Sequence, residues 1–227
     1  GDLLKFVNTA LAWQSDDRGE AFEGQLARVE DIDGSNVYLD ATLAVGMPIG
    51  ASVRIYRPIQ VRMRGIRFQR LAINGSSRGV LIEAADKPVL QDCAVWNSTC
   101  IGLHLLYCYQ AKVLGGLYRG ANLVVSEQLG YGILLESNWA SEVRGATFKE
   151  CRRSVDLSGY DDDGVPCWYC VIAGNQAYGG GYAEDGSDLW PIGSEGGSGF
   201  GSHGPVVGTV YENNLCVNTF RGFTIRG

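Results

Sequence analysis

Carboxylate side chains gather in one short stretch of the sequence, where a pair of them could act as an acid and a base. Asp156 lies in a segment of alternating apolar residues, and the run Tyr160-Asp161-Asp162-Asp163-Gly164 follows it. Glycoside hydrolysis needs two carboxyl groups roughly 5 to 9.5 Å apart. We expect Asp156 to point outward beside Asp161, with Glu136 nearby, and take these three residues as catalytic candidates. Alternatively, the consecutive aspartates cap a turn and stay solvated, or bind an adventitious cation.

Basic side chains accompany these carboxylates. Arg152 and Arg153 precede Asp156, and an arginine in that place can bind an acidic sugar or assist proton removal, or form an ion pair along a coil edge. His203 is flanked by glycine and serine, and its imidazole can act as an acid or base, or cap a strand with a hydrogen bond. We take Arg152 and His203 as carbohydrate-binding candidates. His104 alternates with leucines, faces outward and receives no role.

Aromatic and acidic residues are interspersed between positions 178 and 204. They are Tyr178, Tyr182, Glu184, Asp185, Asp188, Trp190, Glu195 and Phe200. Aromatic faces stack on sugar rings while carboxylates bind hydroxyl groups, so the segment could form a carbohydrate platform. Tyr178, Tyr182 and Trp190 are therefore carbohydrate-binding candidates. The alternatives are a loose glycine-rich loop and a loop that packs on a neighbouring subunit.

The composition is that of a globular protein rich in turns. The chain has 227 residues, of which 45% are hydrophobic and 19% charged, and its 32 glycines show no collagen-like period. A net charge of −6 argues against nucleic acid as a partner. No apolar run is long enough to cross a bilayer, so we expect no membrane insertion.

The seven cysteines cannot all pair with one another, because their number is odd. Cys167 and Cys170 form a CxxC motif, but no second pair accompanies it, and a structural zinc site needs four ligands. We therefore expect buried free thiols, no metal site and no cofactor. A zinc or redox role for the CxxC motif is the minor alternative.

One short string recurs along the chain. Its variants are Arg78-Gly-Val-Leu-Ile-Glu, Ile101-Gly-Leu-His-Leu-Leu, Tyr131-Gly-Ile-Leu-Leu-Glu, Arg153-Ser-Val-Asp-Leu-Ser and Arg221-Gly-Phe-Thr-Ile-Arg. Apolar residues alternate with variable ones, which is typical of a strand with one buried face. The equivalent residues Val80, Leu103, Ile133 and Val155 follow one another at steps of 23, 30 and 22 residues. Such a period indicates a repeat architecture.

A second kind of apolar segment precedes each of these strings. Its variants begin at Ile59, Val89, Ala111, Glu142 and Val206. One coil cannot bury its inner face alone, so the coils must stack. The sequence therefore predicts an all-β protein, a right-handed parallel β-helix. Because strands lie directly at both ends of the sequence, we expect it to be a fragment of a longer chain.

Two segments depart from the coil pattern. Residues 1–57 contain an alternating segment on each side of Asp33-Gly34, which predicts a β-hairpin element docked on the solenoid. Residues 58–227 form the predicted coils, interrupted by a glycine-rich loop insertion at 178–204. A loop of that length inside a compact domain is usually functional or disordered.

The coil pattern resembles that of a known family. The residues that carry the likeness are Gly24-Gln-Leu-Ala-Arg-Val-Glu-Asp-Ile-Asp-Gly-Ser-Asn-Val-Tyr-Leu, Leu129-Gly-Tyr-Gly-Ile, Cys151-Arg-Arg-Ser-Val-Asp, and Ser202-His-Gly joined to Glu212-Asn-Asn and Arg221-Gly-Phe. They are similar to the pectate-lyase-like β-helix superfamily, especially the tailspike and tail-fibre proteins of bacteriophages. The resemblance implies a bacterial surface polysaccharide as ligand, a homotrimer, and a location in the virion tail or outside the cell. No catalytic motif of the family transfers residue by residue.

Three functions fit these observations, because this fold carries lyases, hydrolases, esterases and pure binders. The first is a phage module that recognises bacterial surface polysaccharide. The second is a polysaccharide hydrolase or lyase that uses Asp156, Asp161 and Glu136. The third is a structural spacer in which the coils set only length and stiffness. The sequence leaves open whether the protein is an enzyme.

Overall fold

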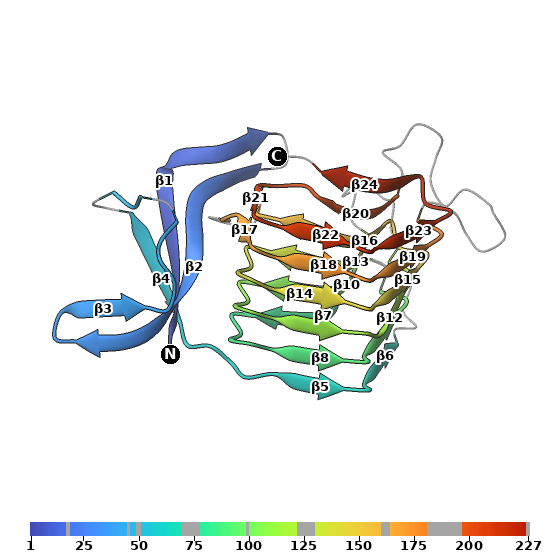
Figure 1. Ribbon diagram of the computed structural model, residues 1–227, viewed down its shortest axis with the longest axis horizontal. Coiled ribbons are helices and arrows are strands. Elements are labelled where there is room, and N and C mark those ends of the chain that lie inside the picture. Colours follow the sequence, from blue (N-terminus) through green and yellow to red (C-terminus); the bar gives the residue numbers. More distant parts are fainter. Residues whose placement is uncertain are drawn as a thin grey trace.

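The protein is a stack of β-strand coils with a separate antiparallel sheet at one side (Figure 1). The computed structural model describes residues 1–16, 19–44, 46–48, 51–69, 78–98, 100–121, 130–159, 164–180 and 197–225. Every regular element in this part of the chain is a β-strand. Among the described residues, no helix is long and apolar enough to cross a membrane.

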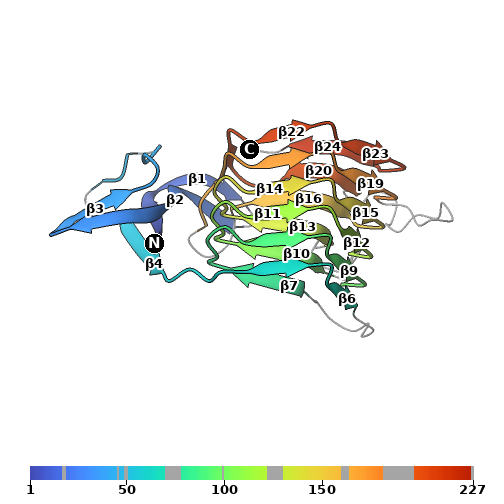
Figure 2. The same ribbon diagram turned by 60° about the horizontal axis from the view of Figure 1, so that its bottom comes forward.

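The first sheet is parallel and contains six strands in the order β24-β20-β16-β13-β10-β7. Their bounds are β7 (Arg78–Glu83), β10 (Ile101–Leu106), β13 (Tyr131–Glu136), β16 (Arg153–Ser158), β20 (Ser198–Ser202) and β24 (Arg221–Ile225). The view of Figure 2 shows this sheet along one side of the stack. Five of the six strands are the recurring string of the sequence.

The second and third sheets also contain six parallel strands each. The second sheet consists of β5 (Arg62–Arg64), β8 (Val89–Gln91), β11 (Lys112–Leu114), β14 (Glu142–Arg144), β18 (Val171–Ala173) and β22 (Val210–Glu212). The third sheet consists of β6 (Arg67–Gln69), β9 (Ala94–Trp96), β12 (Leu117–Arg119), β15 (Thr147–Lys149), β19 (Gln176–Tyr178) and β23 (Leu215–Val217). A short pair, β17 (Cys167–Trp168) with β21 (Val206–Val207), adds to one corner.

The register of the first sheet agrees with the period of the sequence. Leu103 pairs with Val80 on one side and Ile133 on the other, and Ile133 pairs with Val155. Leu103, Ile133 and Val155 belong to one buried apolar cluster inside the coils, and the partly buried Val80 packs against it. The prediction of a parallel β-helix is confirmed.

Left-handed backbone at fixed corners accounts for part of the high glycine content. The turn between the second and third sheets has a positive φ in every coil, at Gly65, Asp92, Gly115, Gly145, Gly174 and Asn213. Glycine, asparagine and aspartate tolerate this conformation better than other residues. The repeated turn therefore selects these residue types in coil after coil.

The N-terminal part of the chain forms an antiparallel sheet in the order β3-β2-β1-β4. Its strands are β1 (Leu3–Asp16), β2 (Gly19–Asp33), β3 (Asn36–Leu39) and β4 (Ser52–Tyr56). The β2–β3 turn lies at Gly34, whose φ is +58°. This sheet lies beside the coils near the strand ends of the second sheet (Figure 1).

An aromatic ladder on successive coils packs against this N-terminal sheet. Tyr109, Trp139 and Trp168 stack with ring centroids 6.3 and 5.9 Å apart. The Trp168 indole donates a hydrogen bond of 2.9 Å to the carbonyl oxygen of Gly24 in β2. The Tyr109 hydroxyl donates to Asp40 at 2.9 Å. The ladder therefore joins the antiparallel sheet to the parallel coils.

The structure adds strands that the sequence pattern did not reveal. β18 and β19 complete a coil between the segments beginning at Glu142 and Val206. β20 lies within the range expected to be a loop, 178–204, and its Phe200 is fully buried in the core. Phe200 is therefore a packing residue and not part of a carbohydrate platform. Residues 181–196 of the expected insertion lie outside the described residues.

Candidate functional site

The outer face of the first sheet carries buried polar side chains. Val155 and Leu157 of β16 point into the apolar core. The intervening Asp156 therefore points to the opposite face, since side chains alternate along a strand. On that face Arg153, Asp156 and His203 are only 2%, 0% and 8% exposed. Buried charges on the outer side of a sheet are unusual and need specific partners.

Asp156 contacts both of the other groups. Arg153 Nη1 donates to Asp156 Oδ1 at 2.9 Å. His203 Nδ1 lies 2.5 Å from Asp156 Oδ2. The backbone N–H of His203 also donates to the carbonyl oxygen of Leu157 at 2.9 Å, which fixes the histidine next to β16. We call Arg153, Asp156 and His203 the first-sheet cluster.

The contact with Asp156 selects one tautomer of His203. His203 Nδ1 lies 2.5 Å from a carboxylate oxygen that can only accept, so Nδ1 carries the proton and donates a hydrogen bond to Asp156. Arg153 Nη1, which has only donors, lies 2.8 Å from the same nitrogen and therefore does not hydrogen-bond it in this tautomer. Nε2 is then the basic atom of the neutral ring. Within the described part of the chain, Nε2 makes no hydrogen bond.

Electrostatics keep the carboxylate charged and the imidazole neutral. Burial works to raise the pKa of Asp156, but the attraction of His203 and Arg153 outweighs it and holds that pKa below its usual value of 3.8. For His203, burial is the largest influence and lowers its pKa below 6.5, against the attraction of Asp156. At neutral pH the cluster therefore contains an ionised carboxylate and a neutral imidazole whose Nε2 is unprotonated.

Tyr131 and Arg152 surround the cluster. The Tyr131 ring meets the His203 ring edge-on, with centroids 5.9 Å apart. The Arg152 guanidinium lies over the Tyr131 ring at 5.5 Å from its centroid, and Arg152 is 1% exposed. Burial raises the pKa of Tyr131 to about 12, so its hydroxyl stays protonated at neutral pH. Two arginines thus accompany one aspartate, which leaves an excess of positive charge.

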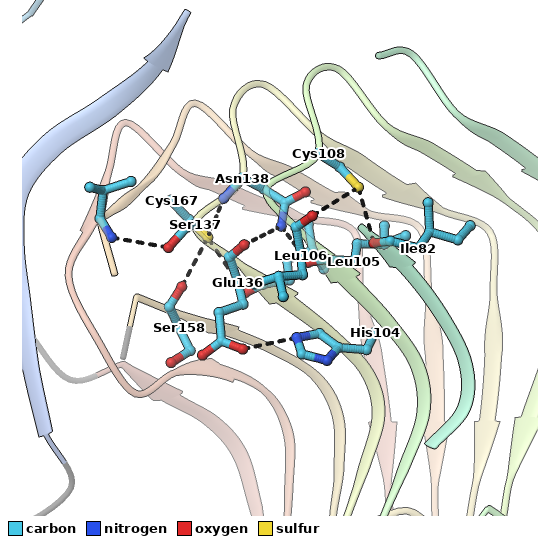
Figure 3. A network of polar contacts seen from close by, with 12 residues as sticks. Ile82, His104, Leu105, Leu106, Cys108, Glu136, Ser137, Asn138, Ser158 and Cys167 are labelled. Carbon is cyan, nitrogen blue, oxygen red and sulfur yellow. Dashed lines mark hydrogen bonds and ion pairs between the residues drawn. The ribbon is translucent and has the colours of Figure 1, made fainter. Parts of the chain in front are cut away.

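A second polar pair lies on neighbouring strands of the same sheet (Figure 3). His104 Nε2 of β10 lies 2.9 Å from Glu136 Oε2 of β13. His104 is 1% exposed, and its Nδ1 is buried with no hydrogen-bond partner in the part of the chain that the structure describes. Leu134 of β13 is in register with both His104 and Asp156 and separates the two polar groups.

The register relates the second pair to the first-sheet cluster. Glu136 pairs with Ser158 of β16, and His203 follows Ser202, which pairs with Leu157. Glu136 and His203 therefore lie at the same level of the sheet, two strand spacings apart. Because neighbouring strands lie about 4.8 Å apart, their Cβ atoms are about 10 Å from each other.

The structure brings some of the predicted site residues together. Asp156 and His203 are in direct contact, Arg152 is close by through Tyr131, and Glu136 lies on the same sheet face. Tyr178 lies apart from them, because it belongs to β19 of the third sheet and donates to Gln176. Asp161, Tyr182 and Trp190 lie outside the described residues.

Two residues that form these polar contacts, Arg153 and His104, are not among the site residues predicted from the sequence. Arg153 begins β16 at the register position of Tyr131, and only the tertiary structure shows its contact with a histidine 50 residues away. His104 was regarded as an outward residue without a role. Its signal was its alternation with Leu103 and Leu105, which placed it on the same sheet face as Asp156.

The cysteines lie elsewhere. All seven are free, and six of them are buried. Burial raises the pKa of Cys108 and of Cys151 to about 12, so both stay protonated at neutral pH. Cys167 and Cys170 pack in the same apolar cluster as the inner strands. No group of potential metal ligands occurs among the described residues.

The sequence matches no protein-family model and no curated protein, whereas the structure is similar to solved structures of phage tailspikes. The Gp54 tailspike of Acinetobacter baumannii bacteriophage AP22, solved with an A. baumannii capsular saccharide, has a TM-score of 0.65 and 16% identity. The match covers 94% of this chain and 33% of that one.

Two tailspikes of Pseudomonas phages are similar as well. For gp49 of phage LKA1 the TM-score is 0.63 at 14% identity, over 99% of this chain and 40% of that one. For gp61 of phage phi297 the TM-score is 0.59 at 16% identity, over 99% and 41%. The chain thus spans between a third and two fifths of these tailspikes, and it has the parallel β-helix fold of phage tailspike proteins.

Proposed function

We propose that the protein is a tailspike-type module that recognises a bacterial surface polysaccharide, with the first-sheet cluster at its binding face. In this proposal the module belongs to a phage tail and assembles as a homotrimer. The fold is similar to that of a tailspike solved with a capsular saccharide, which supports the ligand class.

The observation that carries the proposal is the buried first-sheet cluster. Removing an ion pair from water is unfavourable, and apolar residues of similar size would often stabilise the fold as well or better. Among the described residues, Arg153 Nε and Ser198 Oγ are also buried without hydrogen-bond partners, although Ser198 is the register neighbour of Arg153. Perturbed, tightly paired charges of this kind concentrate at functional sites. A spacer needs none of them.

The test is a binding measurement with a panel of bacterial capsular and lipopolysaccharide glycans and with whole cells. The proposal expects at least one glycan to bind the wild-type protein, and Arg153→Met to weaken that binding. Arg144→Gln serves as the control, since Arg144 is exposed in an ion pair on the second sheet. Failure to bind any glycan or cell would leave the spacer as the better interpretation.

Cleavage of the polysaccharide is a second candidate function. It is favoured by the pairing of a neutral His203, oriented by an ionised Asp156, with a Glu136 carboxyl held by His104 at the same level of the sheet. His203 Nε2 can accept a proton, and the Glu136 carboxyl lies at the same level of the sheet, where it can contact the other side of a bound glycan. In this arrangement Asp156 is a positioning residue, and Glu136 and His203 touch the substrate.

The cleavage hypothesis predicts new reducing ends when the protein is incubated with the glycan that it binds. Ultraviolet absorbance of an unsaturated product distinguishes a lyase from a hydrolase. His203→Ala and Glu136→Gln should each abolish cleavage while the glycan still binds. Unchanged cleavage by both variants would refute this assignment, and binding without cleavage would leave recognition as the function.

The assembly is tested separately by sedimentation of the purified protein. The proposal expects a species of three chains. A monomer at all concentrations would contradict self-assembly of this part of the chain, without affecting the ligand.

A further inference from the structure

The β2–β3 hairpin extends from the N-terminal sheet, away from the coils (Figures 1 and 2). Its residues 30–38 are all exposed. Three carboxylate side chains lie close together there, those of Glu30, Asp31 and Asp33, and none of them forms an ion pair within the described part of the chain. We call these three residues the acidic hairpin.

The register of the hairpin places two of the carboxylates on one face. Asp31 pairs with Tyr38, and Ile32 pairs with Val37. Because side chains alternate along a strand, Asp31 and Asp33 point to one side and Ile32 points to the other. Two residues of a strand span about 7 Å, which is the separation of the two aspartates along β2. The exposed Tyr38 ring lies beside Asp31 on the same face.

A basic surface lies at one end of the coil stack. The coil that contains β5 and β6 is the last one in the order of the second and third sheets. Residues 57–69 of this coil contain four arginines and no carboxylate side chain. Arg57, Arg62, Arg64 and Arg67 are all exposed, and in the described ranges none of them forms an ion pair. We call these four residues the end-coil arginines.

The neighbouring side chains show which way these arginines point. Met63 and Phe68 pack against the apolar core. Arg62, Arg64 and Arg67 therefore point outward from the coil. Arg62 and Arg64 are two residues apart on β5, so their separation of about 7 Å equals that of the two aspartates on the hairpin. Two guanidinium groups of one surface can thus meet two carboxylates of the other at the same time.

Both surfaces also expose apolar side chains. Val37 and Tyr38 are exposed on the hairpin, and Ile59 and Ile66 are exposed on the end coil. Protein–protein interfaces are enriched in tyrosine and arginine, and a guanidinium can lie over a tyrosine ring. The composition of the two surfaces is therefore that of an interface as well as of opposite charge.

The two surfaces belong to different parts of one chain. Figure 1 shows β3 at the far left and β5 at the bottom of the coil stack. Neither surface is neutralised by ion pairs within the chain, so the two can compensate each other only between copies. A contact between two like surfaces would be unfavourable, because it brings charges of the same sign together. A head-to-tail contact of unlike surfaces avoids this and can close into a ring by rotation.

We propose that the acidic hairpin of one copy binds the end-coil arginines of the next copy, with Asp31 and Asp33 facing Arg62 and Arg64. The inference rests on the self-assembly that is part of the proposed function, and it names the surfaces that carry this assembly. Neither surface includes a residue of the first-sheet cluster, so glycan binding is tested independently.

The experiment reverses the charges of each surface in the full chain and measures self-association by sedimentation over a range of protein concentrations. The first variant is Asp31→Lys with Asp33→Lys, and the second is Arg62→Glu with Arg64→Glu. The third variant combines all four substitutions. Arg221→Glu is the control, because it reverses an exposed arginine on β24, at the other end of the stack.

We expect each of the first two variants to weaken the association constant by about tenfold or more, because two attractive contacts become repulsive. The combined variant should return to within about threefold of the wild type, since its charges are again opposite. Raising the salt from about 0.1 M to about 1 M should weaken the wild type and the combined variant alike. Arg221→Glu should associate like the wild type. Thermal unfolding of every variant checks that the fold is intact.

Three outcomes would overturn the inference. Wild-type assembly that is unchanged by both reversals would show that other surfaces carry it, while the self-assembly of the proposed function stands. Weakening by both reversals without recovery in the combined variant would show that the two surfaces do not contact each other. A wild-type protein that stays a monomer at every concentration would refute the proposed self-assembly and this inference together, and would leave the glycan proposal to its own binding test.

Discussion

Asp156 is held by two partners at once, a guanidinium on its own strand and an imidazole that follows a different strand. This double contact explains why a fully buried aspartate keeps its charge, since each partner compensates for lost hydration. It also sets the orientation of His203 and leaves Nε2 as the basic atom of its neutral ring. Removing one member therefore affects the others, because the remaining charges stay buried without compensation.

Asp156→Asn should strongly destabilise the protein. The substitution leaves Arg153 buried without its carboxylate, and breaking such a pair typically lowers the free energy of unfolding by about 3–5 kcal/mol. Urea unfolding measures the change. Glu142→Gln is the matched control, because it breaks partly exposed ion pairs with Arg144 and Lys112, and surface pairs contribute about 0–1 kcal/mol each. Similar losses in the two variants would contradict the special role of the buried cluster.

Acidification should destabilise the protein in a window set by His203. Its pKa is lowered in the folded state, so below about pH 6.5 the unfolded chain binds a proton that the folded chain resists. The free energy of unfolding therefore falls as the pH decreases below that value. The lowered pKa of Asp156 adds a further loss below pH 3.8.

Thermal unfolding between pH 7.5 and 5 checks this dependence. A change of 1 kcal/mol moves the midpoint by about 2–4 °C in a protein of this size. His203→Gln removes the titrating group and should flatten the pH dependence within that interval. An equally steep dependence in His203→Gln would show that another group is responsible.

At the scale of the strand, glycine at the second position of the recurring string permits close approach of neighbouring coils. The strands β7, β10, β13, β20 and β24 all have glycine there. A Cβ atom at Gly102 would lie 2.4 Å from the carbonyl oxygen of Gly132 on the next strand. β16 has Ser154 instead, so its surroundings accept a side chain.

Gly102→Ala should therefore destabilise the coil stack by roughly 1–3 kcal/mol, the usual range for overpacking in a well-packed interior. The obstacle is backbone, which cannot move as easily as the end of a side chain. Ser154→Ala, at the equivalent position of β16, is the control and retains its Cβ. The test compares the unfolding free energies of the two variants. An unchanged unfolding free energy in Gly102→Ala would show that the strands can move apart at no cost.

At the scale of the whole molecule, the aromatic ladder connects two structures of different kinds. The antiparallel sheet contributes the Gly24 carbonyl and Asp40, while the coils contribute Trp168 and Tyr109. Arg28 pairs with Asp40 at 3.0 Å and also reaches Asp86 on the coils at 3.6 Å. The contact between the antiparallel sheet and the coils is thus made by both apolar and charged side chains.

Tyr109→Phe should loosen this contact without disrupting the coils. It removes a hydrogen bond to a carboxylate, which usually contributes about 1.5–3 kcal/mol. Hydrogen exchange should increase in β1 and β2 and stay unchanged in β10 and β13. Tyr169→Phe is the control, because Tyr169 is 45% exposed. Increased exchange throughout the coils would indicate that the antiparallel sheet stabilises the whole stack.

The coil architecture could be predicted from the sequence because every coil must bury an apolar side chain at the same position of its strand. Val80, Leu103, Ile133 and Val155 occupy one column, and their spacing shows it directly. β20 was not predicted as a strand. Gly201 and Ser202 lie where other coils have larger residues, so the sequence of this segment is typical of a loop. The column continues there only through Phe200, one buried side chain.

The sequence by itself determined the strand type, the parallel stacking and the outward direction of Asp156, since alternation and period depend on neighbouring residues and on repetition. Only the tertiary structure decided which side chains meet across coils. His203 reaches Asp156 over 47 residues, and Glu136 reaches His104 over 32. The intervening segments vary in length from coil to coil, and no local pattern encodes that variation. The chemistry of the first-sheet cluster therefore depends on register between strands that are distant in sequence.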